Sequence, residues 1–139
     1  MKRSDKNYRP DQAAEHFIPH VKFVPEWFID LGPGSASEFL DVRNRWPSVR
    51  LLGLEPSPIG FGYARDRWPA DGILLQAAAW DRDEMVTLYK ATDLLHGTCF
   101  VDWNHIMRDD VAGDTSDMAQ VQGRSLDSLD GEYGPFSDA

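Results

Sequence analysis

The sequence predicts an α/β fold whose parallel central sheet is the first half of a doubly wound unit. Three apolar segments of strand character, at about 26–31, 49–55 and 72–79, alternate with two helical segments, at 35–46 and 59–68. Strands that alternate with helices favour right-handed crossovers and a parallel sheet. With 139 residues, the chain has the length of one ordinary domain.

The N-terminal segment, 1–24, is predicted to be polar and to end in a short helix. Apolar residues recur at helical spacing over 11–20, and Pro19 would end the helix. His16 and His20 would lie one turn apart on it, which is a spacing found in metal sites. No further ligand motif accompanies them, so no metal is predicted.

The remainder, 25–139, is predicted to form the sheet domain, organised around the stretch 27–37. This stretch has the pattern of a buried strand that carries Asp30 near its end and turns through Gly32 and Gly34 into a helix. Glycine has no Cβ, so a turn of this kind can bend sharply and bring the backbone into contact with a ligand. Ligands of doubly wound sheets bind at this end of the parallel strands.

The second strand also ends in an acid, Glu55. A carboxylate has two acceptor oxygens and can pair with both hydroxyls of a ribose. Glu55 lies 21 positions after Gly34 (55 − 34), close to the spacing expected of a ribose-binding acid. The alternative role for Glu55 is a solvent-exposed strand end. The third strand, 72–79, is almost continuously apolar, which is typical of a strand buried on both faces.

The C-terminal half has weaker patterns. The segment 85–89 is predicted to be an antiparallel strand and 121–126 another short strand, with a polar end over 130–139. Between them, 90–120 shows little periodicity, so an irregular lid or binding loop is predicted there.

Composition restricts the partners and the compartment. The formal net charge of −9 makes nucleic acid an unfavourable partner and disfavours an anionic membrane surface. A single cysteine, Cys99, permits no disulfide within the chain, and no signal peptide or membrane-spanning run is evident. A cytoplasmic protein is therefore expected.

Asp30 discriminates between two classes of cofactor. An acid beside the glycine turn would repel the pyrophosphate of a dinucleotide, and Ser37 stands where the third glycine of the dinucleotide pattern would fall. S-adenosylmethionine carries an ammonium and a sulfonium and has no phosphate. The charge of Asp30 therefore favours this cofactor over NAD, and half of an NAD-dependent oxidoreductase stays as an alternative.

Several segments resemble a known family in the order in which they occur. FIDLGPG at 28–34 is similar to the first motif of class I S-adenosylmethionine-dependent methyltransferases. LEPSP at 54–58, LQAAAWD at 75–81, VTLY at 86–89 and RSLDSL at 124–129 resemble its FkbM-type branch.

The resemblance implies a Rossmann-like three-layer sandwich, with S-adenosyl-L-methionine as the cofactor. Such enzymes usually transfer a methyl group to an oxygen of a small molecule, often a sugar or a secondary metabolite. His96 and His105 are weak candidates for a base that deprotonates the acceptor. The implied roles are the methionine end and ribose for Asp30, Gly32 and Gly34, the ribose hydroxyls for Glu55, and the adenine for Gln76, Ala77 and Ala78.

One departure from the family concerns the end of the chain. In the family, a strand with an Asp-x-Glu-Gly segment follows the Leu-Asp element and pairs with the first strand, in the order 3-2-1-4-5. The sequence reaches Ala139 without it. The expectation is a domain truncated after its first βαβαβ half, with an exposed edge that a second chain or a dimer could cover. A non-catalytic fragment that binds cofactor or a partner is the second alternative.

Overall fold

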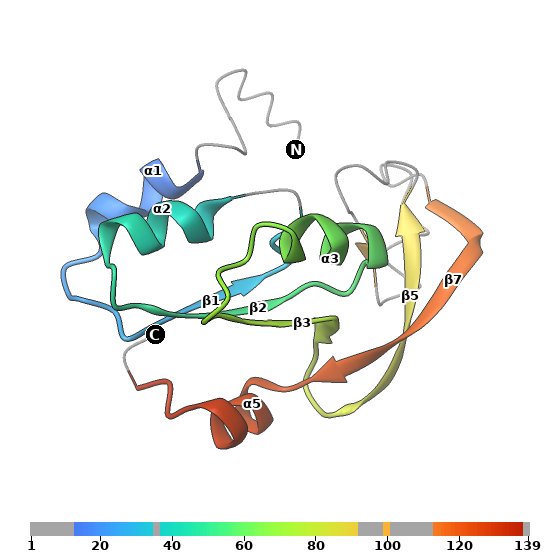
Figure 1. The fold of residues 1–139 in the computed structure, drawn as a ribbon. Helices are drawn as coiled ribbons and strands as arrows, with labels where there is room; N and C mark the ends of the chain where they lie inside the picture. The colour runs from blue at the N-terminus through green and yellow to red at the C-terminus, as the bar shows by residue number, and fades with distance from the viewer. Residues whose placement is uncertain (1–12, 35–36, 92–98, 101–112, 138–139) are drawn as a thin grey trace.

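The described residues form two β-sheets, with helices on both sides of the first sheet (Figure 1). The structure is a computed structural model, and it describes residues 13–34, 37–91, 99–100 and 113–137.

The first sheet is parallel and has the order β1–β2–β3. It is formed by β1 (Trp27–Leu31), β2 (Arg50–Leu54) and β3 (Ile73–Leu75). The register places Leu31 opposite Leu54, and Leu54 opposite Leu75 in turn, so the three strands end at the same edge. With its crossover helices, this sheet has the Rossmann-like α/β architecture that the sequence predicts.

Helices cover both faces of this sheet, in the three-layer arrangement that was expected (Figure 1). The first helical segment is predicted over 11–20, and in the described residues it consists of an α-helix and a 3₁₀ turn that contains Pro19. On one side lie α1 (Ala13–Phe17), η2 (Ile18–His20), α2 (Glu38–Arg45) and α3 (Pro58–Arg65), and on the other lies α5 (Leu126–Tyr133).

The two faces of β2 explain why its sequence does not alternate between apolar and polar residues. Leu51 packs in a cluster with Phe39 and Val42 of α2. Its neighbour Leu52 points the other way and packs in a cluster that includes Leu129 of α5. Burying a leucine side chain fully stabilises the fold by roughly 1.5–3 kcal/mol, so both layers of helices contribute to holding the sheet.

The second sheet corrects the predicted single strand at 72–79 and part of the predicted irregular loop at 90–120. It has the order β4–β7–β5–β6, with β4 parallel to β7 and β5 antiparallel to both β6 and β7. The predicted single strand 72–79 is divided at Gln76: β3 pairs with β2 in the first sheet, and β4 pairs with β7 in the second. The strands are β4 (Ala77–Ala79), β5 (Glu84–Ala91), β6 (Cys99–Phe100) and β7 (Gly113–Arg124).

Part of the predicted irregular loop 90–120 therefore consists of strands. β7 begins at Gly113 and β5 extends to Ala91, while 92–98 and 101–112 lie outside the described residues. The start of β7 is polar and shows no alternation of apolar and polar residues, so its sequence does not predict a strand. It is a strand because it pairs with β5 through backbone hydrogen bonds, which do not depend on side-chain type. The antiparallel orientation of β5 is as predicted.

The polar C-terminal end contains a helix that the sequence analysis does not predict. The Ser125 hydroxyl caps α5 by accepting a hydrogen bond from the Ser128 amide at 3.1 Å. Leu129 is fully buried, and the Phe136 ring beyond the helix meets the Trp27 ring edge-on, with their centroids 5.0 Å apart. Two apolar contacts thus hold a segment whose composition is otherwise polar.

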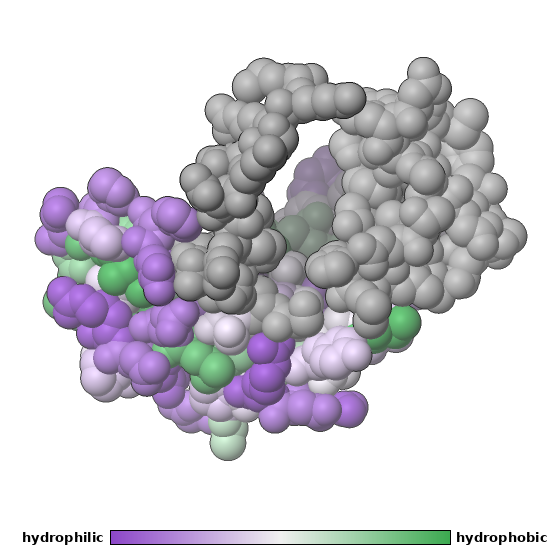
Figure 2. All heavy atoms as spheres, turned by 90° about the horizontal axis from the view of Figure 1, so that it is seen from above, coloured by the Kyte–Doolittle hydropathy of each residue, from purple (hydrophilic) through white to green (hydrophobic). Residues whose placement is uncertain are grey.

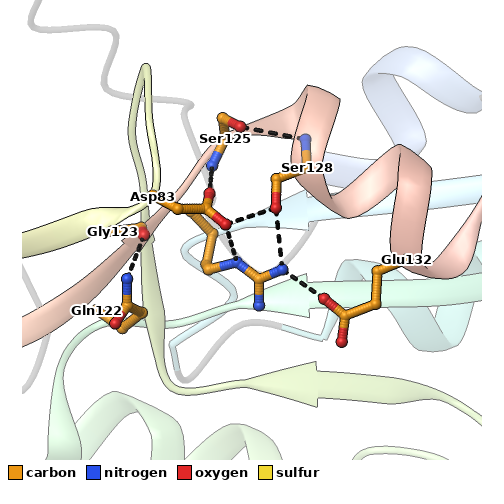
Figure 3. Close-up of polar contacts among 7 residues, drawn as sticks. Asp83, Gln122, Gly123, Ser125, Ser128 and Glu132 are labelled. Carbon is orange, nitrogen blue, oxygen red and sulfur yellow. Dashed lines mark hydrogen bonds and ion pairs between the residues drawn. The ribbon is translucent and has the colours of Figure 1, made fainter.

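A polar network joins α5 to the turn between β4 and β5 (Figure 3). Asp83 accepts hydrogen bonds from the Ser125 amide at 2.9 Å, from Nε of Arg124 at 3.1 Å, and from the Ser128 hydroxyl. Arg124 also pairs with Glu132. The Ser128 hydroxyl, the Ser125 amide and Arg124 all hold the pKa of Asp83 below its usual range. The Arg-Ser-Leu-Asp element therefore has a structural role in docking α5.

The surface over the helices is mostly hydrophilic, with scattered apolar side chains, where the described residues can be seen (Figure 2). In that described part of the chain, no helix combines the length and the apolar character needed to cross a membrane.

Candidate functional site

The glycine turn at the end of β1 has a backbone shape that depends on glycine. Gly32 has a φ of +84° and Gly34 a φ of +49°, both in the left-handed region, which residues with a Cβ rarely adopt. The Gly32 amide donates a hydrogen bond of 2.8 Å to the Leu54 carbonyl, which carries the β1–β2 pairing one residue past the strand. The loop thus starts from a fixed point beside the end of β2.

Asp30 lies beside this loop with a buried and unsatisfied carboxylate oxygen. Its Oδ2 has no hydrogen-bond partner among the described residues. Burial, together with the neighbouring carboxylates of Glu38 and Glu55, raises the pKa of Asp30 from its ordinary value of 3.8 to about 7. A buried acceptor without a donor is destabilising, so this position is suited to a ligand that brings a donor or a positive charge.

Glu55 follows β2 and is turned inward, with only 3% of its surface exposed. Its Oε2 accepts a hydrogen bond from the Gly34 amide at 2.8 Å, and its Oε1 accepts one from the Ser57 amide at 2.9 Å. Burial raises the pKa of Glu55, and the two amide hydrogen bonds oppose that rise. The alternative of a solvent-exposed strand end is therefore wrong. Each oxygen keeps a second lone pair for a further donor.

The start of α3 is shaped to accommodate this carboxylate. The Ser57 hydroxyl caps the helix by accepting a hydrogen bond from the Gly60 amide at 3.3 Å. A Cβ on Gly60 would lie 2.8 Å from Cδ of Glu55, closer than such atoms approach. The missing side chain of Gly60 therefore makes room for Glu55.

A cavity of about 210 Å³ opens at the carboxyl ends of the strands. Gly32 of the loop and Ala78 of β4, two of the predicted site residues, both line it. Ala77 instead packs in the core, and Gln76 is exposed between β3 and β4. The volume suits one ring system better than a whole nucleoside cofactor. The lining residues are mostly apolar: Leu31, Gly32, Leu54, Pro56, Ala78, Ala79 and Leu88.

The two histidines named as candidates for a base, His96 and His105, lie outside the described residues. His16 and His20 are exposed on α1 and η2, and the described part of the chain contains no group of three His, Cys, Asp or Glu side chains that could hold a metal ion.

Two methyltransferases are similar to this chain in sequence. Trans-aconitate 2-methyltransferase of Methylobacterium radiotolerans is 31% identical over 100 residues, which are 71% of this chain and 35% of that protein. Trans-aconitate 2-methyltransferase of Escherichia coli is 27% identical over 100 residues, which are 66% of this chain and 37% of that protein. The chain thus spans about a third of the length of these curated relatives. No family model matches the sequence, and no solved structure matches it either.

The names of both relatives agree with the methyltransferase class that the sequence resemblance predicts. They do not distinguish the FkbM-type branch, which stays a prediction.

Proposed function

We propose that this chain is the cofactor-binding part of an S-adenosylmethionine-dependent methyltransferase that acts on a small molecule. The observation that carries this proposal is the unsatisfied oxygen of Asp30 beside a glycine loop. A buried carboxylate there would be stabilised by an ammonium or sulfonium and destabilised by a pyrophosphate. The names of the two relatives support the same class of protein.

The roles of the individual residues follow from their positions at the strand ends. Asp30, Gly32 and Gly34 would hold the methionine end and the ribose. Glu55 would receive the ribose hydroxyls on the lone pairs that its amide partners leave free. The adenine would lie in the apolar cavity against Ala78, with Gln76 and Ala77 just before it in the chain.

The chain's own contribution to the reaction would be to bind and orient. S-adenosylmethionine supplies an already activated methyl group, so alignment of donor and acceptor accounts for much of the catalysis. A base would assist a hydroxyl acceptor, and His96 and His105 are the candidates. The FkbM resemblance favours a hydroxyl of a sugar or secondary metabolite, whereas the two relatives are named for trans-aconitate.

A second chain is also part of this proposal. Among the described residues, β1 pairs with β2 on one side and with no strand on the other. A strand from another polypeptide could add to that edge by backbone hydrogen bonds.

We expect S-adenosylhomocysteine to raise the melting temperature of the protein and NADH to leave it unchanged. A ligand present at about 100 times its Kd stabilises the folded state by about 2.7 kcal/mol, which thermal unfolding measures readily. Stabilisation by NADH alone would favour the oxidoreductase alternative. Transfer of a labelled methyl group to any member of a panel of sugars and carboxylic acids would rule out the non-catalytic alternative.

A further inference from the structure

Gly34 is held at both of its backbone polar groups by side chains from elsewhere in the chain. Its amide donates to Oε2 of Glu55 at 2.8 Å, and its carbonyl accepts a hydrogen bond from Nη2 of Arg67 at 3.2 Å. Glu55 follows β2 and Arg67 lies just beyond α3. The middle of the glycine loop is therefore fixed to two residues that lie on either side of α3 in the chain.

The Arg67 side chain is itself held in place before it reaches the loop. Its Nε donates to the Tyr63 carbonyl at 3.1 Å, and its guanidinium lies 5.9 Å from the centre of the Phe39 ring. The residue is half-buried, so its contact with Gly34 is shielded from water more than an exposed contact would be. An arginine held by these contacts loses less freedom when it binds a carbonyl.

We propose that Arg67 is a positioning residue for the methionine end of the cofactor, acting through the Gly34 carbonyl. A glycine at a φ of +49° has many accessible conformations, and a carbonyl held on a fixed guanidinium excludes most of them. The loop then meets its ligand already ordered, which removes part of the entropic cost of binding. This inference rests on the proposed function.

A purely structural role for Arg67 would have a different consequence. If Arg67 only held α3 against α2, its loss would weaken every ligand of the site to a similar degree. If it orders the glycine loop, its loss would weaken most strongly the ligands that reach the loop through a methionine end in addition to the ribose. S-adenosylhomocysteine has that end and adenosine lacks it, so comparison of the two separates the roles.

The test uses three variants of the full chain, titrated with both compounds in a calorimeter. Arg67→Met keeps the aliphatic stem of the side chain and removes the Nε and Nη2 donors. Arg67→Lys restores one donor atom, and Arg65→Met is the control. Arg65 is the last residue of α3, two positions before Arg67; it is exposed and pairs with Asp66. We expect Arg67→Met to weaken S-adenosylhomocysteine about tenfold and adenosine less than twofold, with Arg67→Lys between and Arg65→Met unchanged.

The hydrogen exchange rate of the Gly34 backbone amide, measured by NMR without ligand, should rise in Arg67→Met and stay unchanged in Arg65→Met. Unchanged affinity in Arg67→Met, or an equal loss for both compounds, would overturn this inference while leaving the proposed function intact. If the wild-type protein bound neither compound, the proposed function would fail, and the role of Arg67 toward the cofactor would fail with it.

Discussion

Replacing Asp30 by Asn is expected to remove most of the pH dependence of stability between pH 5 and pH 8. The folded pKa of Asp30 is about 7, against an ordinary value of 3.8. Between those values the folded protein holds a proton that the unfolded chain has released, so the free energy of unfolding falls as the pH rises. From pH 5 to pH 8 this group alone should remove about 3 kcal/mol, and the fall should level off above pH 7.

Urea unfolding of wild-type protein and Asp30→Asn at several pH values would measure this difference. Asp81→Asn is the matched control, because Asp81 is exposed and its partner Arg82 lowers its pKa. That carboxyl is ionised in both states above pH 5, so the control should follow the wild-type slope. An equal fall in Asp30→Asn would show that Asp30 is not the buried acid that the structure describes.

The second large effect is expected from two glycines in one helix. Alanine is favoured over glycine in a helix by about 1 kcal/mol, so Gly62→Ala, whose Cβ would meet nothing within 4 Å, should stabilise the protein by roughly that amount. Gly60→Ala places its Cβ 2.8 Å from Cδ of Glu55 and should destabilise the protein by about 1–3 kcal/mol.

Gly60→Ala should also weaken cofactor binding, because the displaced Glu55 would no longer hold the Gly34 amide. Guanidinium unfolding of both variants gives the free energies directly. If Gly60→Ala stabilised the protein as much as Gly62→Ala, the tight packing of Glu55 against α3 would be wrong.

The first sheet could be predicted from the sequence because its signals are local. The strands before Gly32 and Glu55 are apolar runs, mostly buried in β2 and partly buried in β1, and each is followed by turn residues. The glycine loop has its own pattern, Gly-Pro-Gly after an acid. Each of these two signals, the apolar strand and the glycine turn, is therefore contained within a few neighbouring residues of the chain.

The missed features depend on contacts between distant residues. The division of the third strand at Gln76 is determined by pairing with β7, more than forty positions away in the chain. Arg67 contacts a carbonyl 33 positions before it, and neither residue carries a local sign of that contact. The α5 helix did have a signal, the Ser125 cap followed by Leu129 and Tyr133 at helical spacing, but the polar composition around it concealed the pattern.

The most direct test of the central claim is a calorimetric titration of S-adenosylhomocysteine into wild-type protein and Asp30→Asn at pH 6 and pH 8. If Asp30 receives the cationic end of the cofactor, the wild-type protein will bind one equivalent, more tightly at pH 8, where the carboxylate is ionised. The variant will bind weakly at both pH values. Absence of binding to the wild-type protein, or the same affinity in Asp30→Asn at pH 8, would contradict the claim.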